Sequence, residues 1–463
     1  MGHTLKRWVR GAALLPAVAL TGALAYAQEA PDLEARIAAL EDSATASAYI
    51  DNSYLFLLMG MVVMFMAAGF CMLEVGLVRA KNASMQAMKN VAIYALAGLV
   101  TWLCGYHMIY PADGHWLVEN WVSMPVIWSH GALETDNGGY AAGSDWFFQM
   151  VFVATAASIV SGTVAERVKL LPFLIFTMFL CGVIYPIQCS WVWGGGWLSQ
   201  MGFQDFAGST LVHSTGGWAA LIGAILIGPR VGKYFGKQVN PMPGSNIPLA
   251  ALGTFILWLG WFGFNGGSQL AAGTITDINS VSQIFVNTNM GAVGGTVSAM
   301  IVTTVLYRKL DATMVFNGAL AGLVSITASP LEPSVGLATL VGAAGGVLAV
   351  LTVPVLDKLK IDDVVGAIPV HLVCGIWGTL AVAFSHRADI GTEDAPHVLS
   401  FAEQLMVQAT GVVAIGIFVM LISLVGWLIL RFTLGLRATE EEELMGMDLA
   451  EVGLEAYPEF TNG

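Results

Sequence analysis

The sequence predicts an all-α polytopic membrane protein: eleven transmembrane helices, arranged as two five-helix repeats of opposite topology plus one extra helix. Three observations predict this class. Of 463 residues, 56% are hydrophobic and 11% charged, and the mean hydropathy is +0.71, values typical of a chain that crosses a bilayer many times. Basic residues gather at alternate ends of the apolar stretches, and an Asp-x7-His pattern occurs twice inside apolar surroundings.

The N-terminus has the features of a secretory signal peptide over residues 1–27. Three basic residues precede an apolar stretch at 11–24, and an A-Y-A cleavage site ends at Ala27. An uncleaved membrane anchor is the alternative. Residues 28–50 then predict a short amphipathic extracellular helix. A Sec-type signal on a polytopic chain favours a bacterial inner (plasma) membrane protein whose mature N-terminus lies outside.

Eleven apolar stretches are long enough to span a hydrocarbon layer of about 30 Å. The last is long enough to require tilt. In chain order they cover residues 53–78, 90–110, 146–166, 170–191, 208–228, 247–266, 281–306, 313–329, 335–356, 364–384 and 402–430.

The distribution of basic residues fixes the predicted orientation. Cytoplasmic loops of membrane proteins carry an excess of Lys and Arg. The loops 111–144, 192–207 and 267–280 contain no Lys or Arg. On the predicted extracellular side, only Arg36 and Arg387 follow the signal peptide. The C-terminus is therefore predicted to be cytoplasmic. The basic residues at the predicted cytoplasmic ends are Arg79, Lys81, Lys89, Arg167, Lys169, Arg230, Lys233, Lys237, Arg308, Lys309, Lys358, Lys360, Arg431 and Arg437.

The repeated pattern is Asp205 with His213 and Asp363 with His371. Eight helical residues rise about 12 Å, so an aspartate at a helix mouth places its histidine near the middle of the membrane. Asp205 enters the fifth span from outside and Asp363 enters the tenth from the cytoplasm, so the histidines converge from opposite faces. This is the signature of an inverted-repeat transporter or channel. The segments DFAGSTLVHSTGG and DVVGAIPVHLVCG also match at Gly208/Gly366, Val212/Val370 and Gly217/Gly375.

These four polar residues are expected to face the bundle interior, because charged groups facing lipid are costly. A carboxylate at a helix N-terminus accepts hydrogen bonds from the free backbone N–H groups there, so Asp363 is predicted to be a structural helix cap. For Asp205, two interpretations stay open: it is a helix cap only, or it is a cap that also shapes an external cation site. The histidines are either a structural pair or a polar path through a dry core, and their mid-membrane depth favours the path.

A second group of residues lies at the predicted outer face. Trp193 opens a WGGG motif, Phe152 lies in FFQMVF, and Phe264 and Ser268 lie in WFGFNGGS. Aromatic faces attract a small cation, and a serine hydroxyl can accept its N–H bonds. The alternative for each aromatic residue alone is core packing or the interfacial aromatic belt. Glu74 lies near Arg79 and Lys81 at a helix end and is predicted to form a structural ion pair.

No metal, cofactor, enzymatic activity or nucleic-acid partner is predicted. Two histidines without a nearby third ligand make a poor metal site. The five cysteines lack CxxC spacing and are predicted to be small buried hydrophobes, although a disulfide between Cys181 and Cys189 stays open.

Together these residues resemble the ammonium transporter (Amt/Mep/Rh) family, in its bacterial Amt branch, over about residues 51 to 458. The matching motifs are WGGG, DFAGSTLVH, GWFGFNGGS, FVNT, IDD followed by VH, and the tail LRATEEEELMGMDLAEVGLEAYP. The resemblance implies a homotrimer with one pore per subunit, and a transmembrane domain at 51–434 followed by a cytoplasmic regulatory tail at 435–463.

The resemblance also implies roles for individual residues. These are Trp193, Phe152 and Ser268 as the external ammonium recruitment site, supported by Asp205; Phe152 and Phe264 as a stacked phenyl gate; Trp261 as a residue of the pore wall; and His213 and His371 as the paired pore histidines.

The function implied is ammonium uptake, in which the cation is recruited outside, loses its proton and crosses as ammonia, because dehydrating a full cation into an apolar tube is very costly. The proton is expected to follow. A passive ammonia gas channel and an ammonium sensor are the alternatives; a sensor is expected to need an added signalling domain, for which the tail is too short. The tail is expected to dock a trimeric P-II-type signal protein, and a solvated acidic tail is the simpler interpretation.

Overall fold

The computed structural model describes residues 14–111, 115–129, 139–392 and 395–458, with side chains from Leu33 onward. In these ranges the chain is an α-helical membrane bundle. Two small antiparallel hairpins lie in loops, β1 (Trp116–Val118) with β2 (Val122–Ser123) and β3 (Tyr234–Phe235) with β4 (Gln238–Val239).

The helices follow the predicted order. The first half contains α2 (Leu14–Leu77), η1 (Ala80–Asn82), α3 (Ala83–Val100), η2 (Thr101–Gly105), α4 (Tyr106–Ile109), α5 (Ala142–Thr163), α6 (Leu170–Phe179), η3 (Leu180–Ile184), α7 (Tyr185–Ser190), α8 (Trp197–Gln200), η4 (Ser209–Ser214) and α9 (Thr215–Ile227). The second half contains α10 (Ile247–Gly267), α11 (Ile275–Tyr307), α12 (Ala312–Ile326), α13 (Val335–Leu359), η5 (Ile368–Val373), α14 (Cys374–Ala381) and η6 (Val382–Phe384). The chain ends with α15 (Phe401–Thr433), α16 (Glu440–Met445) and η7 (Asp448–Val452).

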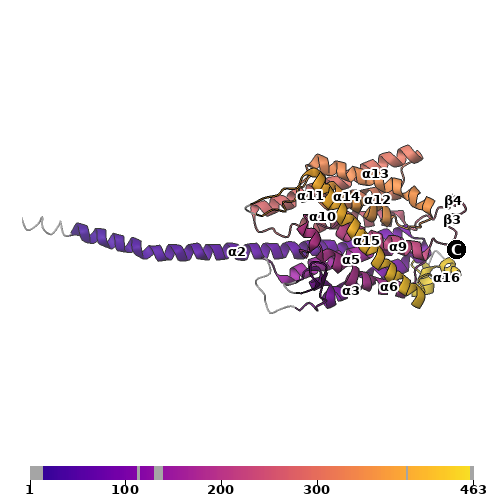
Figure 1. Ribbon diagram of the computed structural model, residues 1–463, viewed down its shortest axis with the longest axis horizontal. Coiled ribbons are helices and arrows are strands. Elements are labelled where there is room, and N and C mark those ends of the chain that lie inside the picture. Colours follow the sequence, from indigo (N-terminus) through magenta and orange to yellow (C-terminus); the bar gives the residue numbers. More distant parts are fainter. Residues whose placement is uncertain (1–13, 112–114, 130–138, 393–394, 459–463) are drawn as a thin grey trace, which may run out of the picture.

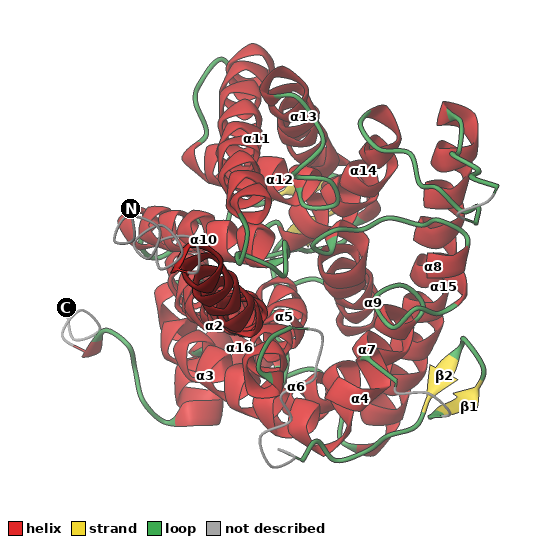
Figure 2. Ribbon diagram, turned by 90° about the vertical axis from the view of Figure 1, so that its left-hand side faces the viewer, coloured by secondary structure: helices red, strands yellow, loops and turns green. Residues whose placement is uncertain are grey.

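The predicted number of membrane segments is confirmed. Among the residues that the structure describes, nine helices are long and apolar enough to cross a membrane, and two shorter apolar helices, Ala312–Ile326 and Ile368–Phe384, coincide with the other two predicted spans. In Figure 2 the helices α11–α14 lie on one side of the bundle and α3, α4, α6 and α7 on the other. The two halves therefore face each other across the centre of the molecule.

The first helix differs from the prediction. Residues 1–13, nearly half of the predicted signal segment, lie outside the described part, and residues 14–27 form the first turns of α2. The predicted extracellular helix at 28–50 is helical but is continuous with the first span. The N-terminal part of α2 projects far beyond the bundle (Figure 1).

The second span also begins earlier than predicted. We expected it from residue 90, whereas α3 starts at Ala83. Hydropathy misses this turn because it carries Gln86, Lys89 and Asn90, which are polar and yet buried inside the bundle.

The first helices of the two halves pack side by side in opposite directions. A Cβ on Gly76, at the end of α2, would lie 2.5 Å from the backbone nitrogen of Ala250, at the start of α10. Toward the other end, a Cβ on Gly263 of α10 would lie 2.9 Å from Cβ of Val62 on α2. Small residues let membrane helices approach this closely. This antiparallel packing of α2 and α10 is the arrangement expected of two halves with opposite topology.

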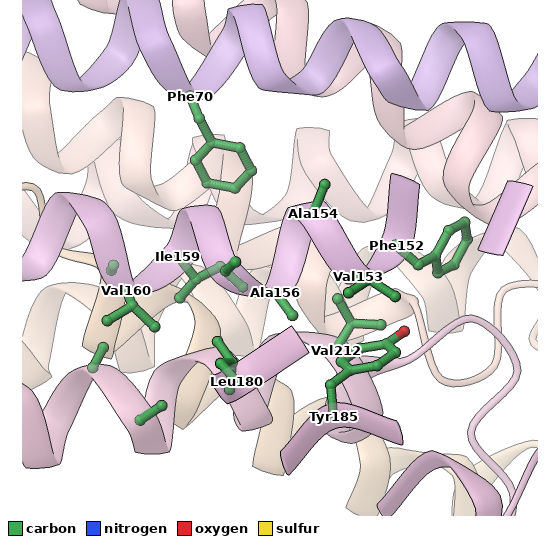
Figure 3. Packing of buried hydrophobic residues seen from close by; sticks show 14 of the residues in the cluster. Phe70, Phe152, Val153, Ala154, Ala156, Ile159, Val160, Leu180, Tyr185 and Val212 are labelled. Atoms are coloured by element: carbon green, nitrogen blue, oxygen red, sulfur yellow. The ribbon is translucent and has the colours of Figure 1, made fainter. Parts of the chain in front are cut away.

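Helix α5 is the central element of the buried core. Its Phe152, Val153, Ala156 and Ile159 pack among neighbouring helices, with Val212 close by (Figure 3). Of the candidate spans, α5 has the largest buried share, 89%. A helix that is apolar on every side belongs inside a bundle, and this position lets α5 contribute to the pore along its whole length.

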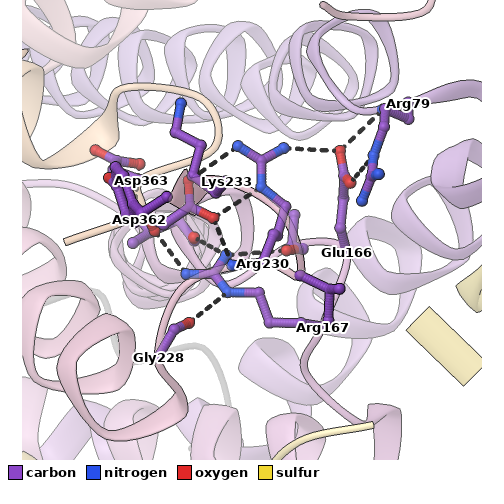
Figure 4. Close-up of polar contacts among 12 residues, drawn as sticks. Arg79, Glu166, Arg167, Gly228, Arg230, Lys233, Asp362 and Asp363 are labelled. Atoms are coloured by element: carbon purple, nitrogen blue, oxygen red, sulfur yellow. Dashed lines mark hydrogen bonds and ion pairs between the residues drawn. The ribbon is translucent and has the colours of Figure 1, made fainter. Parts of the chain in front are cut away.

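We call the end of the bundle that carries the C-terminal tail the inner end, and the opposite end the outer end. At the inner end, Arg230 binds Asp362 through Nε at 2.8 Å and Glu166 through Nη1 at 3.0 Å (Figure 4). Burial raises the pKa of Asp362, but the hydrogen bonds from Arg230 outweigh it and hold that pKa well below its usual range. The network joins the two halves.

The predicted ion pair of Glu74 with Arg79 or Lys81 is wrong. Arg79 Nε instead binds Glu166 at 2.5 Å, and Lys81 Nζ donates to carbonyl groups of the tail. Glu74 points into the bundle and is 1% exposed. Sequence proximity suggested the pair, but the chain turns between Leu77 and Ala80 and separates these side chains.

Candidate functional site

The two halves each place one histidine on a π-helical segment at the centre of the bundle. These segments are η4 and η5, and each follows a glycine in the left-handed region, Gly208 with φ 103° and Gly366 with φ 78°. Glycine adopts this conformation without the penalty that a side chain brings. π-Helical turns are rare and frequently occur at functional sites. The glycine match seen in the sequence thus reflects one local geometry used twice.

Both aspartates of the repeat hold the starts of these segments. The Asp205 carboxylate accepts from the backbone nitrogens of Gly208, Ser209, Thr210 and Leu211 at 2.8–3.1 Å. Asp363 accepts from the backbone nitrogens of Gly366 and Ile368 at 3.2 and 2.7 Å, and from Thr163 Oγ1 at 3.1 Å. Each carboxylate therefore acts as a helix cap and accepts hydrogen bonds from backbone N–H groups that would otherwise be unpaired.

The two histidines meet at the contact between the halves. Their Nδ1 atoms lie 3.3 Å apart, and both rings are buried. Two matched glycines allow this approach: a Cβ on Gly217 would lie 2.7 Å from the backbone nitrogen of Leu372, and one on Gly375 would collide with Ser209 and Ser214.

One shared Nδ1–H···Nδ1 bond has a chemical consequence. The ring that donates keeps a bare Nε2, which can accept a proton, whereas the ring that accepts keeps an Nε2–H, which can donate one. Nε2 of His213 has no hydrogen-bond partner in the part of the chain that the structure describes. The pair thus has an acceptor at one end and a donor at the other.

A column of aromatic rings leads to this pair. Phe152 and Phe264 stack with centroids 3.9 Å apart and planes inclined by 18°. His213 follows, 5.2 Å from Phe264 and 4.9 Å from Trp261. Trp261 is fixed by an Nε1 hydrogen bond to Thr327 Oγ1 at 2.8 Å. On the far side of the pair, Phe70 lies 6.0 Å from His371.

A cavity of about 480 Å³ opens at the outer end of this column. Phe152, Trp193 and Ser268 line it together, so the structure brings the three predicted recruitment residues to one place. Ser268 Oγ donates to the Phe264 carbonyl at 2.8 Å, which leaves its lone pairs to accept N–H groups.

Asp205 does not line this outer cavity. Its carboxylate is occupied by backbone amides, and its own carbonyl accepts from Trp193 Nε1 at 3.1 Å. The geometry places Asp205 behind Trp193 as the group that orients the indole.

The outer cavity also contains a carboxylate that was not predicted from the sequence. Asp145, in the first turn of α5, lines it and is 8% exposed. Its Oδ2 accepts from Tyr106 Oη at 2.5 Å. The described lining residues include no Lys or Arg, so the negative charge has no cationic partner there. The signal was an aspartate beside the aromatic run WFF, which resembles an ordinary acidic residue of a helix N-terminus.

Two observations concern the cysteines and the possible metal ligands. In the described ranges the five cysteines are free, so Cys181 and Cys189 form no disulfide there. No group of three or more His, Cys, Asp or Glu side chains that could hold a metal ion occurs among those residues.

Known proteins are similar to this chain in sequence and in architecture. A model of the Ammonium Transporter Family matches residues 54–457. Ammonium transporter Amt2 of Archaeoglobus fulgidus is 39% identical over 424 residues, covering 87% of each chain, and a putative ammonium transporter of Synechocystis is 38% identical over 410 residues, covering 88% of this chain and 89% of the relative.

Solved structures agree with these relatives. A structure described as a "Sensor Amt Protein" superposes with a TM-score of 0.81 at 36% identity, covering 87% of this chain and 98% of that one. Candida albicans Mep2 superposes with a TM-score of 0.74 at 25% identity, covering 89% and 92%. Because the family match spans nearly the whole described bundle and the relatives are named as transporters, this multi-pass membrane protein belongs to the Ammonium Transporter Family, a class of transporters and not of enzymes.

Proposed function

We propose that this protein takes up ammonium by recruiting the cation in the outer cavity, removing its proton, and passing ammonia along the aromatic column and the histidine pair. The observation that carries the proposal is the continuous order Trp193, Phe152, Phe264, His213, His371 from the outer cavity inward. Cation–π faces and the Ser268 hydroxyl favour NH4+ at the entrance.

The closed phenyl stack supports deprotonation before passage. Rings 3.9 Å apart are in van der Waals contact, so they must part to admit even one small molecule. Beyond them the wall offers few polar groups, and an unpaired cation there is far more costly than a neutral ammonia molecule. The neutral form is therefore the species that moves past Phe264.

Net uptake of ammonium requires the released proton to cross as well. The histidine pair supports a route for it, because its two ends offer an acceptor and a donor. A passive gas channel would move ammonia alone. The sensor alternative is favoured by one observation, the likeness to a "Sensor Amt Protein"; in that case ammonium would bind in the outer cavity with little or no flux.

Current recording on proteoliposomes separates these functions. Electrogenic transport predicts a current when an ammonium gradient is applied, saturating with ammonium concentration. A pH transient inside the vesicles without current indicates a gas channel, and saturable ammonium binding without flux indicates a sensor. Liposomes without protein provide the background.

We further propose a homotrimer in a bacterial inner membrane, with the N-terminus outside and the tail in the cytoplasm. The asymmetry of Lys and Arg supports the orientation, and membership of the family supports the trimer.

The tail is not simply a solvated strand. Asp448 accepts from the backbone nitrogens of Ser84 and Met85 at 3.0 and 2.8 Å, and Met447 N donates to Asn82 Oδ1 at 2.9 Å. Its acidic side chains Glu440 and Glu441 stay exposed, and Glu442 is partly exposed. This arrangement supports docking of a P-II-type signal protein at the inner end.

A further inference from the structure

A second, much smaller cavity lies on the inner side of the histidine pair. Its lining includes Phe70, Glu74, Asn317, Val365 and His371. Its volume of about 10 Å³ corresponds to roughly one water-sized sphere. The cavity thus brings one pore histidine and one carboxylate to the same small space.

Glu74 is held in an unusual position for a carboxylate. It lies near the inner end of α2 and is 1% exposed. Oε2 accepts from Ser161 Oγ at 2.7 Å, whereas the buried Oε1 has no hydrogen-bond partner among the described residues. A buried acceptor left unpaired is costly, and a carboxylate inside a membrane bundle is retained when it serves a function.

The groups that face Glu74 come from three helices. Lys89 of α3 is fully buried and donates from Nζ to the Ser161 carbonyl at 3.0 Å, so Lys89 and Glu74 bind the same residue of α5. Lys89 Nζ also lies 4.8 Å from the Phe173 ring centre. Asn90 of α3 and Cys71 of α2 complete the electrostatic surroundings. The positive charge of Lys89 makes a negative Glu74 tolerable in this dry region.

We propose that Glu74 is the proton acceptor on the inner side of the histidine pair. In this step the pair carries one extra proton, and a ring N–H bond breaks while its electron pair stays on nitrogen. The proton passes, directly or through one water in the small cavity, to the Glu74 carboxylate, where an O–H bond forms. Release of that proton to water at the inner end restores the starting charges, and ammonia arriving there takes up a proton.

This proposal deepens the proposed function and rests on it, because it assigns the exit for the proton that electrogenic transport requires. The competing role is structural: Glu74 would only neutralise Lys89. The two roles differ in what happens when both charges are removed together. We therefore compare Glu74→Gln with the double variant Glu74→Gln/Lys89→Met in full-length protein.

If Glu74 accepts the proton, both variants lose about tenfold or more of the ammonium-driven current, a loss typical of removing an acid–base group. If Glu74 only neutralises Lys89, the double variant regains wild-type current, and the proposal is overturned. Glu74→Asp, which keeps the acid, is expected to restore part of the current. Glu332→Gln is the matched control, because this carboxylate pairs with His386 at the outer end and does not line either pore cavity.

An infrared measurement makes the test independent of the current. Addition of ammonium to wild-type vesicles should produce a protonated-carboxyl signal that is absent from Glu74→Gln and retained in Glu332→Gln. If wild type carries no current, the electrogenic function fails, and the infrared signal alone then decides Glu74. A signal that persists unchanged in Glu74→Gln overturns the assignment.

Discussion

At the scale of single residues, the outer cavity combines two ways of attracting a cation. Trp193 offers an aromatic face, and its position depends on one hydrogen bond to the Asp205 carbonyl. Asp145 adds a buried negative charge, and the described lining, which includes His107, contains no Lys or Arg. A charge in a cavity with low-dielectric walls concentrates the opposite ion. Selection at the entrance should therefore respond to both residues, and differently to each.

Trp193→Leu removes the aromatic face and keeps an apolar side chain. A cation–π contact contributes on the order of 1 kcal/mol, so the half-saturating ammonium concentration should rise about fivefold with little change in the maximal current. Concentration-dependent currents on proteoliposomes measure this. An unchanged half-saturation would mean that Trp193 is an interfacial anchor only.

Asp145→Asn removes the charge at nearly constant shape. Half-saturation should rise several-fold, and its dependence on ionic strength should weaken, because screening acts on charges. Tyr106→Phe is the control: it deletes the hydrogen bond to Asp145 but leaves the carboxylate. If Asp145→Asn keeps the wild-type salt dependence, the carboxylate does not attract the substrate.

At the scale of elements, the repeated Asp-x7-His pattern predicted more than two side chains. The two histidines do lie together, because in each half the aspartate and the glycine precede the π-helical segment, η4 or η5, that carries the histidine. The pattern could not predict the π-helical turns, because the backbone hydrogen bonding in these turns depends on packing within the bundle. It also could not show that Glu74 points inward, because hydropathy sees only a charge near a helix end.

Gly217→Ala tests the contact between the two pore segments. The new Cβ would lie 2.6 Å from Cβ of Leu372, so η5 must move. Overpacking of this kind costs about 1–3 kcal/mol and should lower both the melting temperature and the current. Gly336→Ala is the matched control, since its Cβ would meet nothing within 4 Å. Equal behaviour of the two variants would contradict a role for Gly217 in bringing the histidines together.

At the scale of the whole molecule, composition and the position of basic residues were sufficient to predict the membrane segments, because the bilayer imposes their length and the spacing of charges. Contacts between distant segments were not predictable in this way. The continuity of α2 through residues 28–50, the Arg230–Asp362 link between the halves and the docking of the tail on Ser84 and Met85 all arise from tertiary packing.

Asp448→Ala should release the tail from the bundle by leaving two backbone donors of α3 without their acceptor. A lost buried hydrogen bond to a charged group costs about 1.5–3 kcal/mol. We expect weaker capture of a P-II-type protein in pull-downs under high-nitrogen nucleotide conditions, with wild-type capture in Glu119→Ala, an exposed control in the β1–β2 hairpin away from the tail. Equal or absent capture by wild type under low- and high-nitrogen conditions would contradict a regulatory tail.

The central claim is that the histidine pair carries the proton while ammonia passes beside it. Replacing both His213 and His371 with Leu removes all the imidazole nitrogens from the centre of the pore but preserves its apolar packing. The decisive measurement is the ammonium-driven current of this double variant in proteoliposomes, with oligomer integrity checked on the same sample. We expect the current to be abolished in an intact assembly. Wild-type current in that assembly would contradict it and would show that the histidines are structural.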